Sequence, residues 1–249
     1  MNRNHYLDCR DVRLDRNVYR YIPLNKLLDL FKQSQSALCH PRKWHDPFET
    51  LLLDAKFRTK NGTVHRFPYR NHIYCQCWTI ESRSDALWKI YCPQLNSRSR
   101  GMRIRTTLRS LADSLSASEI DLDRERAFVG KVQYMSQDAL LNRARTEFTN
   151  KRPIKNIARL LLMKRYAFKH EAEIRLIYIT HKSDHRKDDG ILKYSVKPHE
   201  LISQIMIDPR ITPRQARIVT SHIREQTSYT GEIKHSVMYK KPNDLIVDV

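Results

Sequence analysis

The chain of 249 residues contains little glycine and few acidic residues. Its 5 glycines and 10 prolines are too few for a linker or a low-complexity protein. A hydrophobic fraction of 40%, with 3 Trp, 12 Tyr and 7 Phe, is enough for a packed core and excludes a disordered chain. The 27 Asp and Glu stand against 46 Lys and Arg, which leaves a net charge of +19.

This positive charge exceeds what solubility requires, since a small net charge is sufficient for that. The phosphate backbone of a nucleic acid is the commonest partner of such a chain, because each neutralised phosphate releases a bound counterion. We therefore predict that the protein binds nucleic acid, either RNA or DNA. A generally basic protein without such a partner is the alternative.

Long hydrophobic runs are also missing, and no segment approaches the roughly 18 apolar residues of a membrane helix. Residues 1–20 lack the apolar core of a secretory signal, and their three aspartates are not typical of a mitochondrial presequence. The 5 cysteines are an odd number without the spacing of a disulfide framework. We expect a protein of the reducing cytoplasm with no membrane contact, and a protein partner stays open.

Several common active-site motifs are absent. The chain has no GxxxxGK[ST], GxGxxG, GxSxG or HExxH pattern, which argues against nucleotide-binding loops of these types, serine hydrolases and zinc proteases. Cys75 and Cys77 share one face of a predicted strand, and Cys39 could lie nearby. Structural zinc usually needs two cysteine pairs of CxxC spacing, so we expect free buried thiols and no metal.

Predicted helices and strands alternate without a repeat and without a regular strand–helix–strand rhythm. Apolar residues spaced three and four apart predict helices at residues 24–33 and 154–169. Residues 73–80 and 173–180 are predicted strands, and the first is uncharged and therefore central. The pattern favours an α+β fold, with a mixed, mostly antiparallel sheet flanked by helices, in one domain over residues 1–249.

Two segments carry much of the positive charge. Residues 89–109 hold six basic residues and no acid, and residues 143–169 hold nine basic residues with Glu147 as their only acid. Lys155 and Arg159 lie one helical turn apart, where like charges repel unless an anion covers them. A solvated basic face is the alternative. The predicted nucleic-acid-binding residues are Arg98, Arg100, Arg103, Arg105, Arg152, Lys155, Arg159, Lys164 and Arg165.

Acidic residues gather at two places. Asp46 and Glu49 flank a Pro-Phe pair, and Glu171, Glu173 and Arg175 lie at the start of the predicted strand 173–180. Alternation along a strand places these last three side chains on one face. Charges at a strand that enters the core are costly unless they are paired or functional. A structural ion pair and a catalytic site are equally good interpretations.

Five short blocks follow one another along the chain: Tyr19-Arg20-Tyr21, His45-Asp46-Pro47-Phe48-Glu49, Cys77-Trp78-Thr79, Leu87-Trp88-Lys89-Ile90-Tyr91 before Gly101, and Lys169-His170-Glu171-Ala172-Glu173-Ile174-Arg175. Taken in this order, they resemble the bacterial domain-of-unknown-function family 2971. Three departures stand out: His45 replaces the usual Asn, Trp78-Thr79 replaces Phe-Ser, and Arg103 and Arg105 occupy a strand that is acidic or neutral in the family.

The layout of that family is in turn similar to the ADP-ribosyltransferase superfamily, in which a split sheet holds NAD. The resemblance implies that Arg20 binds the phosphates or ribose of NAD and that Glu173 is the catalytic glutamate, with Glu171 beside it. Such a carboxylate stabilises an oxocarbenium-like transition state, and an arginine can hold the pyrophosphate with two hydrogen bonds. The implied NAD-binding residues are Arg20, Tyr21, Trp78, Thr79, Trp88 and Tyr91.

We therefore expect an NAD-dependent ADP-ribosyltransferase or NAD glycohydrolase that acts on, or is anchored to, nucleic acid, as a toxin or phage-defence effector. A non-catalytic RNA- or DNA-binding module is the first alternative. A metal-dependent nuclease that uses Asp46, Glu49, Glu171 and Glu173 is the second. Convergence of Arg20, Trp78 and Glu173 on one cleft would favour the enzyme.

Overall fold

The structure, a computed structural model, describes residues 5–44, 46–59, 61–93, 100–116, 126–149, 154–181 and 190–241, without the side chains of Leu52, Phe57 and residues 147–149. Of the residues predicted to bind nucleic acid, Arg98 and Arg152 lie outside these ranges, as does His45 of the family resemblance.

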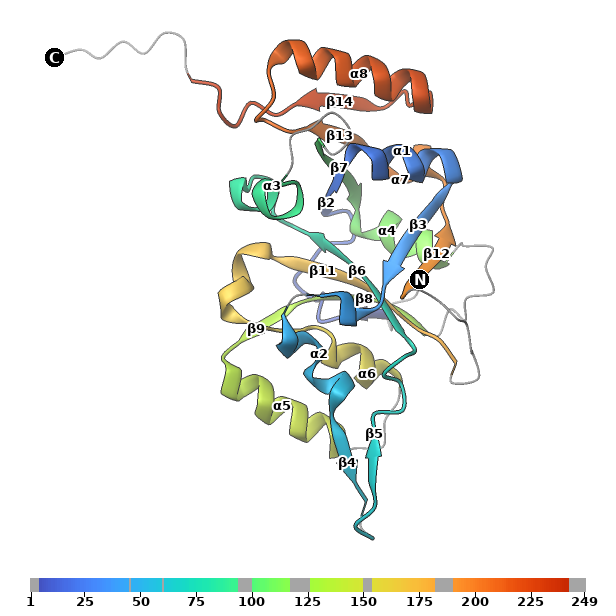
Figure 1. Ribbon diagram of the computed structural model, residues 1–249, viewed down its shortest axis with the longest axis vertical. Coiled ribbons are helices and arrows are strands. Elements are labelled where there is room, and N and C mark those ends of the chain that lie inside the picture. The colour runs from blue at the N-terminus through green and yellow to red at the C-terminus, as the bar shows by residue number, and fades with distance from the viewer. Residues whose placement is uncertain are drawn as a thin grey trace, which may run out of the picture.

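A ten-stranded sheet organises the molecule (Figure 1). Most neighbouring strands are antiparallel, and only β1 with β8 and β13 with β14 run parallel within it. This arrangement confirms the predicted α+β class with a mostly antiparallel sheet. The main path of strands is β1 (Tyr6–Leu7), β8 (Ala127–Lys131), β11 (Glu173–Ile179), β6 (Ile73–Thr79), β2 (Asn17–Pro23), β7 (Gly101–Thr107), β13 (Gln204–Ile207) and β14 (Glu232–His235), and β3 (Gln35–Cys39) with β12 (Ile191–Ser195) branches from β6.

The sheet is split between β2 and β6. Strand β6 pairs with β11 along its whole length, and β2 pairs with β7 along its whole length. Between β2 and β6, in contrast, only Tyr19 and Thr79 are paired, and β3 meets β6 only where Cys39 faces Cys75. The two halves of the sheet therefore separate beyond these contacts and leave room for a cleft.

Two hydrophobic cores cover opposite faces of β6 and β11. The larger core takes Trp78, Leu176 and their neighbours on one face, and the smaller core takes Ile73, Ile177 and their neighbours on the other. Both strands are consequently buried on both sides, as the uncharged segment 73–80 predicts. Helices α1 (Leu24–Gln33), α4 (Leu108–Ser116), α7 (Pro198–Leu201) and α8 (Pro213–Thr227) pack on the larger core, and α2 (Pro47–Asp54) and α6 (Ile154–Leu160) on the smaller.

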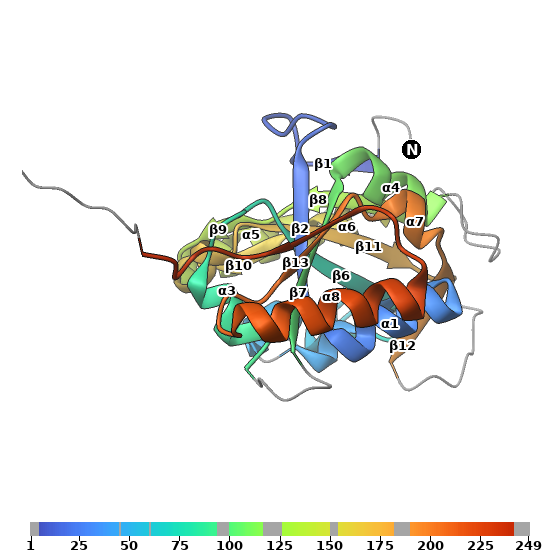
Figure 2. The ribbon, with the colours of Figure 1, turned by 90° about the horizontal axis from the view of Figure 1, so that it is seen from above.

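Helix ends follow local sequence signals. Thr212 and Gln215 form a reciprocal capping box at the start of α8, and Asp46 caps α2, which has Pro47 in its first turn. Helix α1 has the bounds that its apolar spacing predicts and ends at Ser34 in the left-handed region. Seen from above, α1 and α8 lie side by side on one face (Figure 2). None of the helices in the described ranges is long and apolar enough to cross a membrane.

The predicted helix 154–169 is wrong beyond Leu160. The chain leaves α6 there and forms the short strand β10 (Met163–Arg165), which pairs in parallel with β9 (Gln133–Met135). A 3-10 turn, η4 (Tyr166–Glu171), follows and ends at Ala172 with φ 43°. Pairing with β9 and burial of Lys164 outweigh the helical spacing of the apolar residues. This turn delivers Lys164, Glu171 and Glu173 to one place.

Candidate active site

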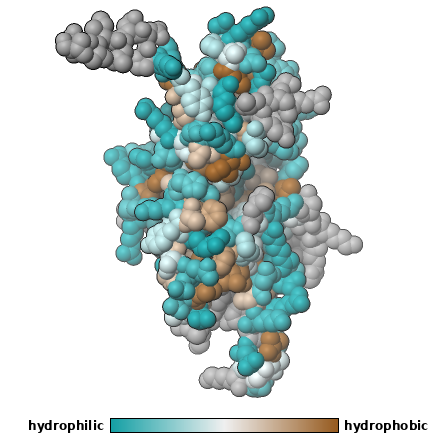
Figure 3. Space-filling model, turned by 60° about the vertical axis from the view of Figure 1, so that its left-hand side comes forward, coloured by the Kyte–Doolittle hydropathy of each residue, from teal (hydrophilic) through white to brown (hydrophobic). Residues whose placement is uncertain are grey.

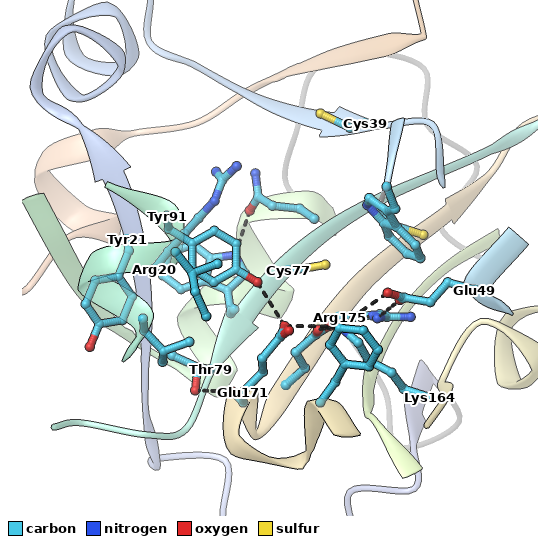
Figure 4. Close-up of a pocket in the computed structure, with 18 of the residues that line it drawn as sticks. Arg20, Tyr21, Cys39, Glu49, Cys77, Thr79, Tyr91, Lys164, Glu171 and Arg175 are labelled. Carbon is cyan, nitrogen blue, oxygen red and sulfur yellow. Dashed lines mark hydrogen bonds and ion pairs between the residues drawn. The ribbon is translucent and has the colours of Figure 1, made fainter. Parts of the chain in front are cut away.

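A cavity of about 460 Å³ opens at the split between β2 and β6. Strands β2, β3, β6, β10 and β11 contribute to its wall, together with η4 and α3 (Asp85–Tyr91). Arg20, Trp78 and Glu173 all line it, so the three residues converge as the enzyme hypothesis requires. Figure 4 shows Glu171, Glu49, Arg175 and Lys164 turned toward one another on one side, with Arg20 and Tyr21 on the other.

Glu171 and Glu173 reach the cavity from different elements. Glu173 begins β11, but Glu171 ends η4 and does not continue the strand, because Ala172 between them has a left-handed backbone. Thr79 Oγ1 donates to the Glu171 carbonyl at 2.6 Å, and the Glu173 amide donates to the Tyr134 hydroxyl at 2.9 Å. These bonds hold the backbone on both sides of Ala172.

Lys164 lies between three carboxylates. Its Nζ is 2.5 Å from Glu173 Oε1, 3.0 Å from Glu171 Oε2 and 3.3 Å from Glu49 Oε1. The Lys164 side chain is only 5% exposed. Sequence reasoning places Lys164 among the nucleic-acid-binding residues, and the structure corrects this because a buried ammonium surrounded by carboxylates cannot face a phosphate backbone.

Arg175 extends the same cluster into the core. Its Nε is 2.7 Å from Glu173 Oε2, its Nη1 donates to the Leu161 carbonyl at 2.7 Å, and its Nη2 forms an ion pair with Glu49. We name Glu49, Lys164, Glu171, Glu173 and Arg175 the buried charge cluster. If all were ionised, its three carboxylates and two cations would leave one unbalanced negative charge.

The excess negative charge explains why the two central carboxyl groups differ. Burial raises the pKa of Glu171 to about 7, and the hydrogen bond with Glu173 and its charge act in the same direction. Burial also opposes ionisation of Glu173, but the Arg175 charge, the bond with Glu171 and the Lys164 charge outweigh it and hold the pKa of Glu173 well below its usual value. At neutral pH, Glu173 is therefore an anion and Glu171 is partly protonated.

Tyr91 joins this wall from the end of α3. Its hydroxyl donates to Glu171 Oε2 at 2.9 Å, and burial raises the pKa of Tyr91. Tyr91 and the neighbouring Ile90 remain 41% and 51% exposed, so both stand at the mouth of the cavity. A ligand that reaches Glu171 must pass them.

Arg20 carries the free positive charge of the opposite wall. Burial lowers the pKa of Arg20, and the groups that act in the opposite direction are Tyr194, Cys39, Cys77 and Tyr91, none of them a carboxylic acid. Among the residues described, no hydrogen bond or ion pair to its guanidinium is formed. A half-buried guanidinium without a counterion is costly, so this wall is suited to an anionic ligand.

Only some of the implied NAD-binding residues line the cavity. Tyr21, Trp78, Thr79 and Tyr91 line the cavity, but Trp88 is 1% exposed and contacts the Tyr21 ring edge-on at 4.8 Å between centroids. The implied role of Trp88 in NAD binding is therefore wrong, because its ring packs α3 against β2. Trp78 donates its Nε1 to Gln76 at 2.7 Å and faces the larger core.

Asp46 has a local structural role beside the cavity. It caps α2 by accepting a hydrogen bond from the Phe48 amide at 3.1 Å, and it pairs with Arg165 at 2.8 Å. The Arg165 guanidinium also lies over the Phe48 ring at 4.2 Å. Arg165 is thus partly neutralised, in contrast to its predicted role as a free phosphate ligand.

The other predicted nucleic-acid contacts do not form one surface. Arg103 is 8% exposed, donates to the Ser82 carbonyl and lies over the Tyr19 ring, so its assignment to a nucleic-acid surface is wrong. Arg105 pairs with Glu232 at 3.7 Å, and Arg100 lines a second cavity between α1 and α8. Half-buried Lys155 and Arg159 lie on α6, on the other half of the sheet (Figure 1).

Sequence reasoning missed several residues of the cavity wall. Lys43 ends the short turn η2 (Pro41–Lys43) and Trp44 follows it, and both line the cavity. The Trp44 ring lies 4.3 Å from the Arg175 guanidinium carbon. Phe168 in η4 covers Lys164 at 4.7 Å. These residues lie next to the Asp-Pro-Phe-Glu and Glu-Ala-Glu blocks in the sequence, and this proximity could have predicted that they line the same cavity.

No family model and no curated protein matches the chain, so the resemblance to family 2971 stays a prediction. The chain is similar to solved structures of DarT from Thermus sp. 2.9 at low sequence identity. The complex with NAD⁺ shares 11% identity at a TM-score of 0.40, with 90% of this chain and 96% of that chain covered. The complex with ADP-ribosylated ssDNA shares 11% identity at a TM-score of 0.41, with 89% and 94% covered.

We predict that Lys164→Met destabilises the protein by about 3–5 kcal/mol, because it leaves buried carboxylates without their shared cation. Urea unfolding followed by circular dichroism measures this change. Lys169→Met, at an exposed position of the turn η4 that follows β10, is the matched control and should change stability by about 0.5 kcal/mol or less. Equal effects of the two substitutions would contradict the described cluster.

We also predict a pH dependence that arises from Glu171. Because its pKa is raised from 4.5 to about 7, the native protein keeps a proton that the unfolded chain releases. Its contribution to the free energy of unfolding therefore falls as pH rises from about 5 to 7. Glu171→Gln, which imitates the protonated form, should remove this decline in urea unfolding measured across that range. A decline of equal size in the variant would refute the assignment.

Proposed function

We propose that the protein is an ADP-ribosyltransferase-like enzyme that cleaves NAD and transfers ADP-ribose to a nucleic acid. The observation that carries this proposal is the arrangement of charge across the cleft, with unpaired Arg20 on one wall and ionised Glu173 on the other. A dinucleotide presents the matching groups, an anionic pyrophosphate and a ribose. The volume of about 460 Å³ lies within the range of small-molecule sites.

Cleavage of NAD breaks the bond between ribose C1′ and the nicotinamide nitrogen, and nicotinamide leaves with the bonding electrons. Positive charge then develops on the ribose, and a carboxylate that accepts a hydrogen bond from a ribose hydroxyl stabilises it. Glu173 is suited to this role because it is ionised at neutral pH and its orientation is fixed by Lys164 and Arg175. Each carboxylate oxygen has two lone pairs, so contacts to these cations leave acceptor capacity.

Glu171 is suited to the second half of the reaction. The acceptor forms a bond to ribose C1′ and loses a proton, and a base with a pKa near 7 accepts this proton efficiently. Tyr91 and Lys164 hold the Glu171 carboxyl in the wall of the cavity, beside the mouth where Tyr91 is exposed and where an acceptor would enter. With water as the acceptor, the same steps would make the protein an NAD glycohydrolase.

The net charge of +19 supports a nucleic acid as the acceptor, since cations along the surface attract and retain a polyanion. Modification of nucleic acid inside a cell would fit the role of a toxin or phage-defence effector.

A non-catalytic nucleic-acid-binding module is a second candidate, and one observation favours it. Every charged group of the buried charge cluster is paired, so the cluster could serve folding alone. The nuclease alternative loses support, because Lys164 Nζ occupies the point between the carboxylates. In the described part of the chain, no group of three metal-binding side chains is arranged to hold an ion.

Glu173→Gln should lower the rate of nicotinamide release by about 100-fold or more, because the neutral amide cannot stabilise the developing positive charge. Chromatographic detection of nicotinamide and mass spectrometry of an oligonucleotide acceptor measure cleavage and transfer. Glu200→Gln, at an exposed site on α7, is the control and should retain full activity. NAD binding by calorimetry shows whether the Glu173 variant is folded. Full activity of a folded Glu173→Gln protein would overturn the proposal.

Arg20→Gln should weaken NAD binding by about 10- to 100-fold through loss of a charged hydrogen bond to phosphate. Its thermal stability without NAD should stay the same or rise, since the substitution removes an unpaired, half-buried charge. Calorimetric titration and thermal unfolding measure the two effects. Arg217→Gln on the exposed side of α8 serves as the control. A lower melting temperature with unchanged NAD affinity would show that Arg20 is structural.

A further inference from the structure

A second charged feature lies outside the cleft, in the hairpin formed by β4 (Lys56–Arg58) and β5 (Val64–Arg66). These two strands pair with each other in a sheet of their own, separate from the ten-stranded sheet. The hairpin projects from one end of the molecule, opposite the end formed by α8 (Figure 1). We name residues 56–66 the basic hairpin.

Local interactions give the basic hairpin a defined turn. The Thr59 amide donates to the Thr63 carbonyl at 2.8 Å, and Gly62 adopts a left-handed φ of 85° that suits glycine. Thr59 Oγ1 also donates to the Thr63 carbonyl at 3.0 Å. The two strands are therefore presented as a ribbon and not as an open loop.

One face of this ribbon is positively charged. Lys56 lies directly opposite Arg66, and Arg58 lies opposite Val64, so all four side chains share one face. Each of them is exposed. No acidic residue occurs in the sequence from residue 55 to residue 80, and no ion pair to these three cations is formed among the residues described.

Like charges directly opposite each other destabilise a strand pair, and within the described part of the chain the exposed cationic face has no acidic partner that compensates. Phosphate groups placed along this face would attract the cations and offset the repulsion between them. At the lower end of the face drawn in Figure 3, hydrophilic side chains lie beside a hydrophobic patch. The absence of acidic residues from residue 55 to residue 80 is what supports an anionic partner.

We propose that the basic hairpin is an arm that binds duplex DNA, with Lys56, Arg58 and Arg66 on its phosphate backbone. The major groove of B-form DNA is wide enough to admit a two-stranded ribbon. The cationic face adds only aliphatic Val64, which offers no ring for stacking with an unpaired base. The arm would hold the protein on DNA whether or not the cleft cleaves NAD.

The test is a fluorescence anisotropy titration of a duplex of about 20 base pairs with the full-length protein, without NAD, at several salt concentrations. The variant Lys56→Ala/Arg58→Ala/Arg66→Ala should bind at least about tenfold more weakly, and the slope of log K against log salt should lose about 2.7 units. Nicotinamide release by this variant should equal that of the wild type, which separates the arm from the cleft.

A matched control removes the same charge at the opposite end of the molecule. Lys32→Ala/Arg214→Ala/Arg217→Ala takes three exposed cations from α1 and α8. This control should keep most of the affinity and the salt slope of the wild type. An equal loss in both triple variants would mean that net charge alone binds DNA, and it would overturn the proposal.

Single-stranded DNA and RNA of equal length complete the experiment. The wild type should bind the duplex DNA most tightly, and only the basic hairpin variant should lose this preference. If that variant binds the duplex normally, or loses only single-stranded DNA or RNA, the arm does not bind duplex DNA. Glu173→Gln should bind the duplex as the wild type does, because the arm acts independently of the cleft. Failure of the proposed enzyme therefore leaves duplex binding unchanged, and failure of the arm leaves nicotinamide release unchanged.

Discussion

Lys164 Nζ stands within 3.3 Å of carboxylates from three different elements, α2, η4 and β11. Arg175, whose side chain is also buried, forms ion pairs with both Glu49 and Glu173. Removal of either cation leaves buried carboxylates without compensation, so these contacts hold the elements around the cleft together. The Lys164 and Arg175 charges also contribute to the difference in pKa between Glu171 and Glu173.

The split of the sheet gives the buried charge cluster its chemical importance. If β2 and β6 were paired along their whole length, main-chain hydrogen bonds would close the space in which Arg20 and Glu173 face a common cavity. Their single contact at Tyr19 and Thr79 keeps the two halves joined and leaves the rest open. The unpaired cation Arg20 thus lies across the cavity from the carboxylate of Glu173, which Lys164 and Arg175 hold in place. A ligand with an anionic middle and a ribose end is complementary to both walls.

Positive charge on the molecule serves at least three different purposes. Lys164 and Arg175 neutralise buried acids, Arg103 and Arg165 cover aromatic rings, and only some of the remaining cations are free to meet a polyanion. The basic hairpin is the clearest of these free groups, since its cations face each other without an acid. Net charge is therefore a guide to the kind of partner, but it does not identify the surface that binds it.

Local pattern was sufficient for part of this protein. The spacing of Leu24, Leu27 and Phe31 predicts α1 correctly, and the uncharged run 73–80 predicts a central strand, because burial on one face or on both faces leaves a direct trace in the sequence. Period-two spacing also placed Glu173 and Arg175 on one face of β11 correctly, but it wrongly included Glu171, which ends η4 before the strand begins. The α+β class followed from the irregular order of such segments.

Tertiary contacts decided the rest. Residues 161–169 have helical spacing, yet parallel pairing with β9 and the attraction of three carboxylates for Lys164 draw them into a strand and a turn. The sequence does not distinguish a lysine that faces solvent from a lysine that pairs with a buried acid. In the same way, it does not distinguish a tryptophan that binds a ligand from one that packs in the core, as Trp88 does. Burial and charge pairing are properties of distant segments brought together, and so they distinguished Lys164 from Lys56 where the sequence alone could not.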